Sequence, residues 1–330
     1  MGIYLGSVEN LKFELDNLKR RFDNSLSNDE YLRNYDNIKT LNDYINNPRI
    51  DHFISTLDNK KYTKEKEKLE KKCYKNIIRN KDMINSLCDG VKDVREDIPY
   101  TLSSTITTVN MISEIKYFLR GHDKLTYKLF QKMLDFEDLY EDDNLSYGTE
   151  EIYDKESGRS FLIFKNSHDL MTEAHLVYAL TSLSLNTNTN SYGEYKYLDS
   201  YRDYKALLNE LLFLDSMKSP SKEEDIKKIW NKLMMKERTS ASKVKKILDS
   251  KDFKSFKSDN LSLDYFKFLL GFILASYSMS SFNRRKVDEC IKSKNSSYKH
   301  LFKNLDVKSS ELINDLEKNY VKHIYKISYN

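Results

Sequence analysis

The sequence has 330 residues, of which 39% are apolar and 12% aromatic, so the chain can build a hydrophobic core and is not a disordered polymer. Its eight glycines and three prolines are too few for many short strands joined by turns, and they favour long helices. The net charge of +4 is too small to indicate nucleic-acid binding by itself. These features predict a predominantly α-helical protein with a multi-helix, bundle-like architecture.

Apolar residues in the N-terminal third recur at helical spacing. Leu11, Leu15, Leu18 and Phe22 are separated by four, three and four residues, which places them on one face of a helix. The same periodicity returns after a polar break at 27–29. Helices are therefore also predicted around 31–41, over 64–94, before Gly121 and over 124–140.

One pair of short segments has the pattern of strands. Glu150–Asp154 and Ser160–Phe164 flank a turn that contains Gly158, and the second segment is rich in residues that suit a pleated surface. We predict a β-hairpin near 149–165. It is also the expected boundary between an N-terminal helical lobe, 1–145, and a C-terminal lobe, 146–330, unless the two form one continuous domain. After the hairpin, helices are predicted at 168–184, 222–236, 241–249, 262–280, 283–294 and 309–326.

Charged residues are unevenly distributed along the chain. Residues 135–157 carry ten carboxylates and one lysine, whereas 218–257 and 284–303 are rich in lysine and arginine. If the two basic stretches share one surface, they would attract phosphate groups. The acidic stretch has three open explanations: a site for a protein partner, an internal mimic of nucleic acid, or a solvated surface.

The three cysteines cannot all form disulfides within the chain. Cys73 and Cys88 are predicted on one helix, where a separation of fifteen residues spans about 22 Å. That distance is too long for a disulfide. Two alternatives stay open: three reduced thiols in a cytosolic protein, or a bridge from Cys290 to a partner chain in a secreted complex.

The sequence predicts no membrane partner. The longest apolar stretch, Tyr265–Ala275, has eleven residues and contains a lysine, which is typical of a buried helix. The first ten residues lack the basic start and apolar run of a signal peptide. We therefore expect a cytoplasmic site of action; secretion would require that the sequence be a mature form without its signal.

Several motifs that bind metals or nucleotides are missing from the sequence. It has no Gly-Lys pair for a phosphate-binding P-loop and no His-Glu-x-x-His for zinc. His168 and His175 share a predicted helix face but lie about 10.5 Å apart along it, too far to bind one zinc ion together. The sequence predicts neither a metal nor a cofactor.

The dipeptide His-Asp occurs twice, at His122–Asp123 and His168–Asp169, as it does in metal phosphohydrolases. Both aspartates also stand where a helix is expected to begin, and the free N–H groups there favour a carboxylate. The second explanation is preferred.

Metal-free acid–base chemistry leaves no compact motif, so the sequence does not exclude it. Cleavage of RNA by its own 2′-OH needs a base, an acid and cations beside the phosphorane. Among the six histidines, His300 has the most suitable surroundings, because Lys299 and Lys303 flank it and nearby aromatic residues could stack on a base. The other explanation is a surface histidine on an exposed turn.

Glu9, His300 and a composition rich in lysine, asparagine and tyrosine resemble the ribonuclease subunits of plasmid-encoded yeast killer toxins. The resemblance implies cleavage of tRNA or other RNA without a metal, with an early glutamate and a late histidine sharing the proton transfers. Arg284 and Arg285 would hold phosphate together with Lys299 and Lys303. The sequence departs from that family in lacking a secretion signal, and the family's arginine is not identifiable.

Two functions are therefore expected from the sequence. The first is a toxin-type, metal-independent endoribonuclease that cleaves RNA by 2′-OH transesterification. The alternative is a non-catalytic helical protein of a virus or mobile element that binds RNA or a host protein.

Overall fold

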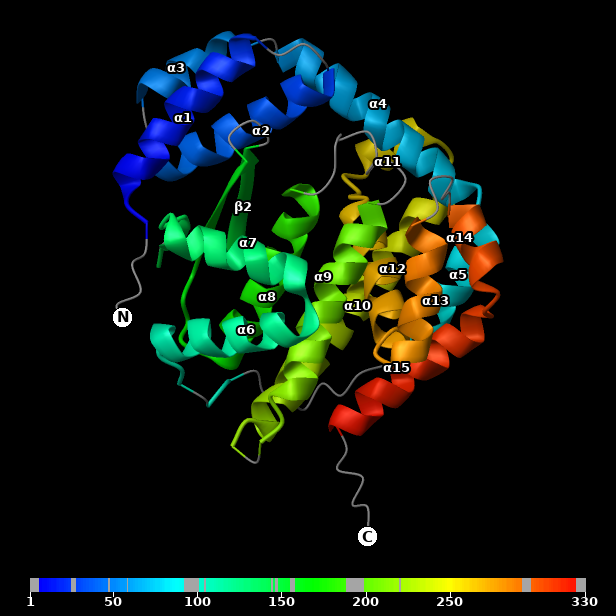
Figure 1. Cartoon of the computed structure of the whole chain (residues 1–330). Coiled ribbons are helices and arrows are strands. Elements are labelled where there is room, and N and C mark those ends of the chain that lie inside the picture. Colours follow the sequence, from blue (N-terminus) through cyan, green and yellow to red (C-terminus); the bar gives the residue numbers. More distant parts are fainter. Residues whose placement is uncertain are drawn as a thin grey trace. The chain divides into compact units, whose positions relative to one another are not determined.

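The structure is a computed structural model of the whole chain (Figure 1). The residues that it describes are 6–24, 28–46, 48–57, 59–91, 101–103, 105–143, 145, 148–154, 158–187, 199–219, 221–292 and 298–324. Within them most residues are helical, which confirms the predicted fold class.

The described residues form fifteen helices and three strands. The helices are α1 (Val8–Asp23), α2 (Asn28–Ile45), α3 (Pro48–Thr56), α4 (Asn59–Ile78), α5 (Lys81–Gly90), α6 (Thr108–His122), α7 (Lys124–Asp135), α8 (Leu170–Thr187), α9 (Asp199–Ser216), α10 (Glu223–Asp249), α11 (Phe253–Ser258), α12 (Asp264–Tyr277), α13 (Ser281–Lys292), α14 (Tyr298–Leu305) and α15 (Ser309–Ile324). The strands are β1 (Leu139–Glu141), β2 (Thr149–Asp154) and β3 (Arg159–Phe164).

The chain forms two compact units, each assembled from segments that are separated in the sequence. Unit 1 consists of 1–69, 107–167 and 179–196, and unit 2 consists of 70–106, 168–178 and 197–330. The predicted lobes, 1–145 and 146–330, stay a prediction. Each unit is described by itself below.

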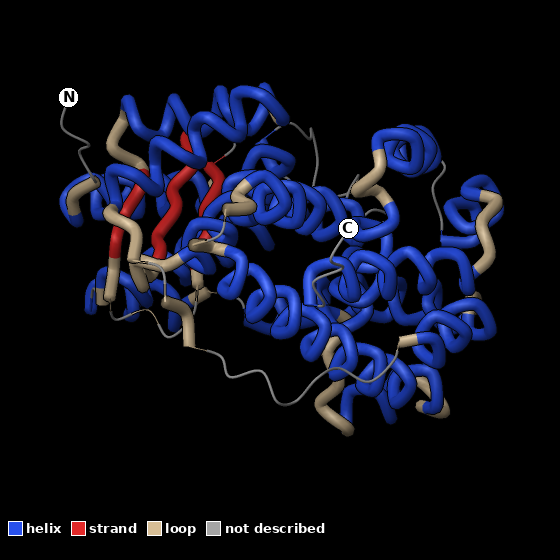
Figure 2. Tube along the Cα trace, turned by 90° about the horizontal axis from the view of Figure 1, so that it is seen from below, coloured by secondary structure: helices blue, strands red, loops and turns tan. Residues whose placement is uncertain are grey.

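Unit 1 is built around a small mixed sheet with the strand order β1-β3-β2, whose strands lie side by side in Figure 2. β2 and β3 are antiparallel, with Ile152 opposite Phe161, which confirms the predicted hairpin. Ile152, Phe161 and Ile163 pack with Leu11 of α1 and Ile38 of α2 in one buried cluster. The apolar stripe predicted on the first helix therefore faces the sheet.

The third strand, β1, lies where the sequence predicted the end of a helix over 124–140. α7 stops earlier because Glu137 adopts a left-handed backbone conformation, with a φ of 56°. The next residue, Asp138, accepts a hydrogen bond at its carbonyl from the N–H of Leu162 at 3.1 Å and forms an ion pair with Arg159. These bonds hold the chain extended beside β3, so part of the acidic stretch 135–157 serves the sheet.

The helix predicted over 64–94 is interrupted. Asn80 separates α4 from α5: its side-chain amide donates to the carbonyl of Asn76 at 2.8 Å, and its own carbonyl accepts from the N–H of Ile84 at 3.1 Å. One residue thus closes the first helix and begins the second. The two cysteines expected on one helix consequently lie on two.

Unit 2 is helical, and its α12 packs against both α9 and α10. α12 is buried along most of its length, which confirms the apolar helix predicted there. α10 is one continuous helix of 27 residues, although two helices were predicted over the same stretch. No helix among the described residues is long and apolar enough to cross a bilayer.

A glycine allows α9 and α12 to lie close together. A Cβ atom on Gly271 would stand 3.1 Å from the backbone nitrogen of Tyr204 and 3.1 Å from the Cβ of Asp203. Any side chain at position 271 would therefore push against the backbone of α9. This contact fixes the place of Asp203 in unit 2.

Candidate functional site

The structure assigns the two predicted catalytic residues to different units. Glu9 is exposed in the first turn of α1 in unit 1. His300 belongs to α14 in unit 2, and its side chain, like that of Lys299, lies outside the described residues. The predicted pairing of Glu9 with His300 gains no support from their positions.

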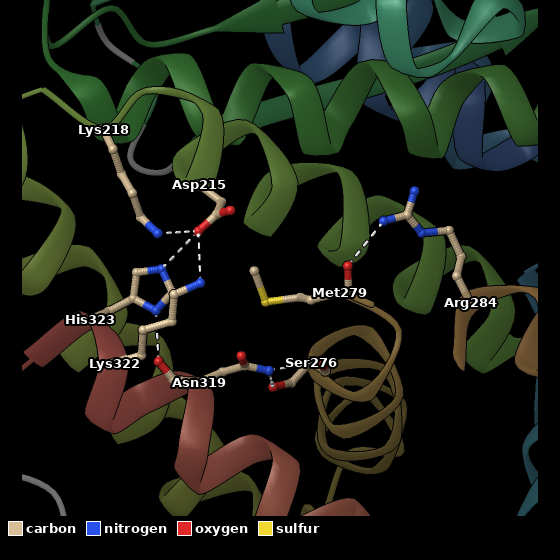
Figure 3. Close-up of polar contacts among 8 residues, drawn as sticks. All are labelled: Asp215, Lys218, Ser276, Met279, Arg284, Asn319, Lys322 and His323. Atoms are coloured by element: carbon tan, nitrogen blue, oxygen red, sulfur yellow. Dashed lines mark hydrogen bonds and ion pairs between the residues drawn. The ribbon is translucent and has the colours of Figure 1, made fainter. Parts of the chain in front are cut away.

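Arg284, predicted to hold phosphate, is bound to the end of a helix. Its guanidinium donates from Nε to the carbonyl of Ser278 and from Nη2 to the carbonyl of Met279, each at 3.2 Å; Figure 3 shows the bond to Met279. These carbonyls follow the last residue of α12, where a cation is favourable. Arg284 therefore has a structural task, whereas Arg285 and Lys303 are exposed.

Many cations of the basic stretch 218–257 are paired with carboxylates within unit 2. The pairs are Lys222–Glu173 at 3.9 Å, Lys228–Asp225 at 4.0 Å, Lys245–Asp89 at 2.6 Å and Lys257–Glu70 at 2.5 Å. Pairing offsets the positive potential that this stretch was expected to provide for phosphate.

Both His-Asp pairs supply helix caps. The carboxylate of Asp123 accepts from the N–H groups of Leu125 and Thr126, and that of Asp169 accepts from the N–H of Thr172 at 2.8 Å. The preferred explanation for these pairs is confirmed.

A different group of titratable side chains gathers in unit 2, on α8, α9 and α10. α10 directs Ile229, Leu233 and Glu237 to the interior at helical spacing, while Lys232 and Lys236 are exposed one turn apart. α9 buries Glu210. Glutamates thus occupy inward positions that helical periodicity normally gives to apolar residues.

The ammonium group of Lys236 is held over an aromatic ring. Its Nζ lies 4.1 Å from the ring centroid of Phe268 on α12, a favourable cation–π distance. No carboxylate of the described residues lies within ion-pair distance of this Nζ. Lys236 is therefore a positioned cation without an anionic partner in the described part of the chain.

Burial favours the protonated form of the two inward glutamates. Burial raises the pKa of Glu210 to about 8 and raises the pKa of Glu237 well above its ordinary value, although the ammonium of Lys236 acts in the opposite direction on both. Oε1 of Glu210 and both carboxyl oxygens of Glu237 have no hydrogen-bond partner among the described residues. These carboxyls do not neutralise Lys236.

His175 on α8 belongs to the same group. Burial, followed by the ammonium groups of Lys236 and Lys232, lowers the pKa of His175 to about 4. The imidazole is therefore uncharged at neutral pH. Its ring stacks on Tyr178, with centroids 5.5 Å apart, and the Tyr178 hydroxyl donates to Oδ1 of Asp203 at 2.9 Å.

These residues do not fit a zinc ion of the His-Glu-x-x-His type. Such a site needs a second histidine four residues after the first and a glutamate directly after it. After His175, the chain has Leu176 and Ala179 at those positions. Asp203, the carboxylate nearest in the network, is bonded to Tyr178 instead.

No sequence pattern indicated this group of residues, which we call the α8–α10 site: His175, Glu210, Lys232, Lys236 and Glu237. They come from three helices and have no shared motif. The one available signal was a glutamate on the apolar stripe of α10, at position 237, since a buried acid is uncommon.

The sequence matches the model of no known protein family and matches no curated protein. The fold, in contrast, is similar to that of a Bacillus anthracis str. Ames protein provisionally named oligoendopeptidase F. The TM-score is 0.50 at 10% identity, over 89% of this chain and 61% of that one. A Chlamydophila abortus protein provisionally named a peptidase gives a TM-score of 0.46 at 12% identity, over 96% of this chain and 62% of that one.

These likenesses correct the expected function. The Bacillus protein carries a peptidase name, so the resemblance to killer-toxin ribonucleases and the prediction of a toxin-type endoribonuclease are wrong. The alternative, a viral helical factor that binds RNA or a host protein, is not favoured either. The chain spans about three fifths of the Bacillus protein and has a fold similar to that part of it.

Proposed function

We propose that this protein binds peptides on a peptidase-like helical scaffold and does not cleave them by zinc chemistry. The fold likeness to a protein named oligoendopeptidase F supports a peptide as the ligand. That likeness covers 89% of the chain at 10% identity, so the scaffold is shared while the side chains differ.

The observation that carries the proposal is the sequence after His175 on α8. Zinc-dependent hydrolysis of the His-Glu-x-x-His type uses two imidazoles to hold the ion and a carboxylate to activate water. Leu176 and Ala179 offer neither group. A scaffold of this fold without those groups can hold a peptide but cannot hydrolyse it by this zinc chemistry.

The α8–α10 site is a suitable place for a peptide to bind. It offers the exposed ammonium groups of Lys232 and Lys236, which can donate hydrogen bonds to peptide carbonyl and carboxylate groups. Glu210 and Glu237 are buried and are not themselves in reach of a peptide.

Binding and cleavage can be measured separately. Fluorescence anisotropy of a fluorescein-labelled mixture of random decapeptides should rise as the full chain is added. Quenched fluorogenic peptides incubated with the protein and zinc chloride should remain intact. Cleavage of those peptides, or no rise in anisotropy, would contradict the proposal.

Two variants test whether the peptide binds at the α8–α10 site. His175→Ala removes an imidazole of the α8–α10 site and should weaken decapeptide binding. His52→Ala removes an exposed histidine of unit 1 and should leave binding unchanged. Equal loss in both variants would indicate nonspecific binding.

A further inference from the structure

We propose that a short segment of the chain's own backbone occupies the surface beside the α8–α10 site and that a peptide must displace it in order to bind. The segment, which we call the strap, consists of Thr101, Leu102, Ser103, Thr105 and Ile106. This inference rests on the proposed peptide-binding function and adds a regulation of the same site.

The strap is bound to α10 through its main chain. The Nζ of Lys228 donates to the carbonyl of Thr101 at 2.6 Å, and the N–H of Ser103 donates to Oδ1 of Asp225 at 2.9 Å. A carbonyl and an N–H two residues apart lie along one edge of an extended chain. Lys228 and Asp225 therefore bind main-chain groups that an extended peptide offers at the same spacing.

The side chains that hold the strap are buried. The side chain of Asp225 is 0% exposed and that of Lys228 is 12% exposed, and their charged groups lie 4.0 Å apart. The hydroxyl of Ser103 donates a second bond to Oδ1 of Asp225 at 3.2 Å. A buried charge is costly without hydrogen bonds, so a peptide that replaces the strap has to supply donors of the same kind.

The strap itself is held by polar contacts rather than by apolar burial. Thr101, Ser103 and Thr105 are exposed, Leu102 is partly exposed, and Ile106 is buried. A segment with little buried apolar surface opens at a low cost in free energy. A ligand that forms equivalent hydrogen bonds can therefore displace the strap.

The strap lies at the N-terminal ends of two helices of the site. On α10, Lys228 precedes Lys232 by four residues, which makes them neighbours on the helix surface. At the other end of the strap, the N–H of Ile106 donates to the carbonyl of His168 at 2.7 Å, seven residues before His175. The strap thus joins the starts of α8 and α10.

A bound decapeptide is long enough to overlap the strap. An extended decapeptide spans about 33 Å, so one that is centred on Lys236 reaches about 16 Å to either side. Along α10, Lys228 lies only about 12 Å from Lys236. A decapeptide at the α8–α10 site that runs along α10 therefore covers the residues that bind the strap.

Ser103→Pro should loosen the strap and leave Asp225 and Lys228 in place. Proline has no amide hydrogen and no hydroxyl, and it is tolerated outside helices and strands. The apparent Kd falls when the fraction of the protein that can bind rises. Labelled random decapeptides should bind Ser103→Pro about tenfold more tightly than the wild-type chain, the factor expected for loss of one hydrogen bond to a charged group.

Ser103→Ala and Thr105→Ala form a matched pair of variants within the strap. Ser103→Ala keeps the main-chain bond to Asp225 and removes the hydroxyl bond, so it should strengthen decapeptide binding about threefold. Thr105→Ala removes an exposed hydroxyl and should leave the affinity unchanged. Urea denaturation shows whether each variant is folded.

Hydrogen exchange reports on the strap in the wild-type chain. Saturating unlabelled decapeptides should make the amide of Ser103 exchange faster, as measured by mass spectrometry of proteolytic fragments that contain it. A strap with a purely structural role would exchange at the same rate or more slowly, and that result would overturn the proposal.

The affinities separate displacement of the strap from peptide binding itself. Equal or weaker binding by folded Ser103→Pro would overturn the role of the strap and leave peptide binding intact. An equal gain in Ser103→Ala and Thr105→Ala would do the same, and this pair decides the question if Ser103→Pro does not fold. Failure of the decapeptides to bind the wild-type chain and every variant would overturn the proposed function, and the role of the strap with it.

Discussion

Both ring nitrogens of His323 of α15 form hydrogen bonds, one of them with the carboxylate of Asp215. Its Nδ1 lies 2.6 Å from the carbonyl of Asn319 and its Nε2 lies 3.3 Å from Oδ1 of Asp215 (Figure 3). These contacts tie α15 to the end of α9, where Asp215 lies.

Replacement of His323 by phenylalanine tests these bonds while keeping an aromatic ring stacked on Trp230. His323→Phe should lower the free energy of unfolding by about 1–3 kcal/mol, since it removes two buried hydrogen bonds. Urea denaturation measures the change. The exposed control, His52→Phe, should change stability by less than about 0.5 kcal/mol.

The hydrogen bond between His323 and Asp215 also predicts how the stability of the fold changes at acidic pH. The hydrogen bond from His323 is the largest cause that holds the pKa of Asp215 well below its ordinary range, and Lys218 and Lys322 contribute. The folded-state pKa is depressed, so this stabilisation is present above the unfolded pKa of about 4 and is lost as pH falls below it. His323→Phe should flatten the loss of stability between about pH 4 and pH 2. If the variant lost stability below pH 4 as steeply as the wild type does, the effect of His323 on Asp215 would be contradicted.

Glu210 predicts a pH dependence of the opposite sign. Its pKa is raised to about 8, so between about pH 4.5 and pH 8 the folded chain holds a proton that the unfolded chain releases. Stability should therefore fall across that window and level off above it. Glu210→Gln, which resembles the protonated acid, should be more stable than the wild type at pH 8.5 and similar to it at pH 4.5.

The check is urea denaturation at the two pH values. Glu67, exposed on α4, gives a control in which Glu67→Gln leaves the pH dependence unchanged. A Glu210→Gln variant that loses stability equally at both pH values would show that the carboxyl is ionised in the fold.

Replacement of Gly271 and of Gly121 by residues with a side chain should have opposite effects on stability. Gly271→Val pushes against the backbone of α9 and should destabilise the protein by about 1–3 kcal/mol. Gly121, near the end of α6, has no atom within 4 Å of an added Cβ. Gly121→Ala should therefore be neutral or stabilising by up to about 1 kcal/mol, because alanine favours the helix. Thermal melting of both variants compares them directly, and destabilisation by Gly121→Ala would contradict the open space.

The cysteines should differ in reactivity. Cys88 is buried, and burial raises its pKa to about 12, whereas Cys73 is partly exposed. Burial also raises the pKa of Cys290. Alkylation by iodoacetamide at pH 8, followed by mass spectrometry, should label Cys73 first because thiolate and access are both required. Faster labelling of Cys88 would show that α5 opens.

The helical class and the hairpin could be predicted because each depends on a local period. Leu11, Leu15 and Leu18 share a face in any helix, and β2 and β3 are close in sequence with a turn between them. β1 could not be predicted in the same way. It has three residues, and its extended form depends on the distant Arg159, which pairs with Asp138.

The candidate site could not be predicted from local sequence patterns. His175, Glu210 and Lys236 lie on three helices, and their meeting depends on packing that the sequence does not display. The prediction at Glu9 and His300 joined two residues from opposite ends of the chain on the lysines around His300 and on a family resemblance, and no tertiary constraint supported it.

The raised pKa of Glu210 has a consequence for the whole chain. The formal charge of +4 counts this carboxyl as an anion, whereas at pH 7 the folded chain holds its proton. The folded protein at pH 7 is therefore more cationic than its formula. Unfolding at pH 7 frees that proton into the medium, so the native and denatured forms should migrate differently in an electric field.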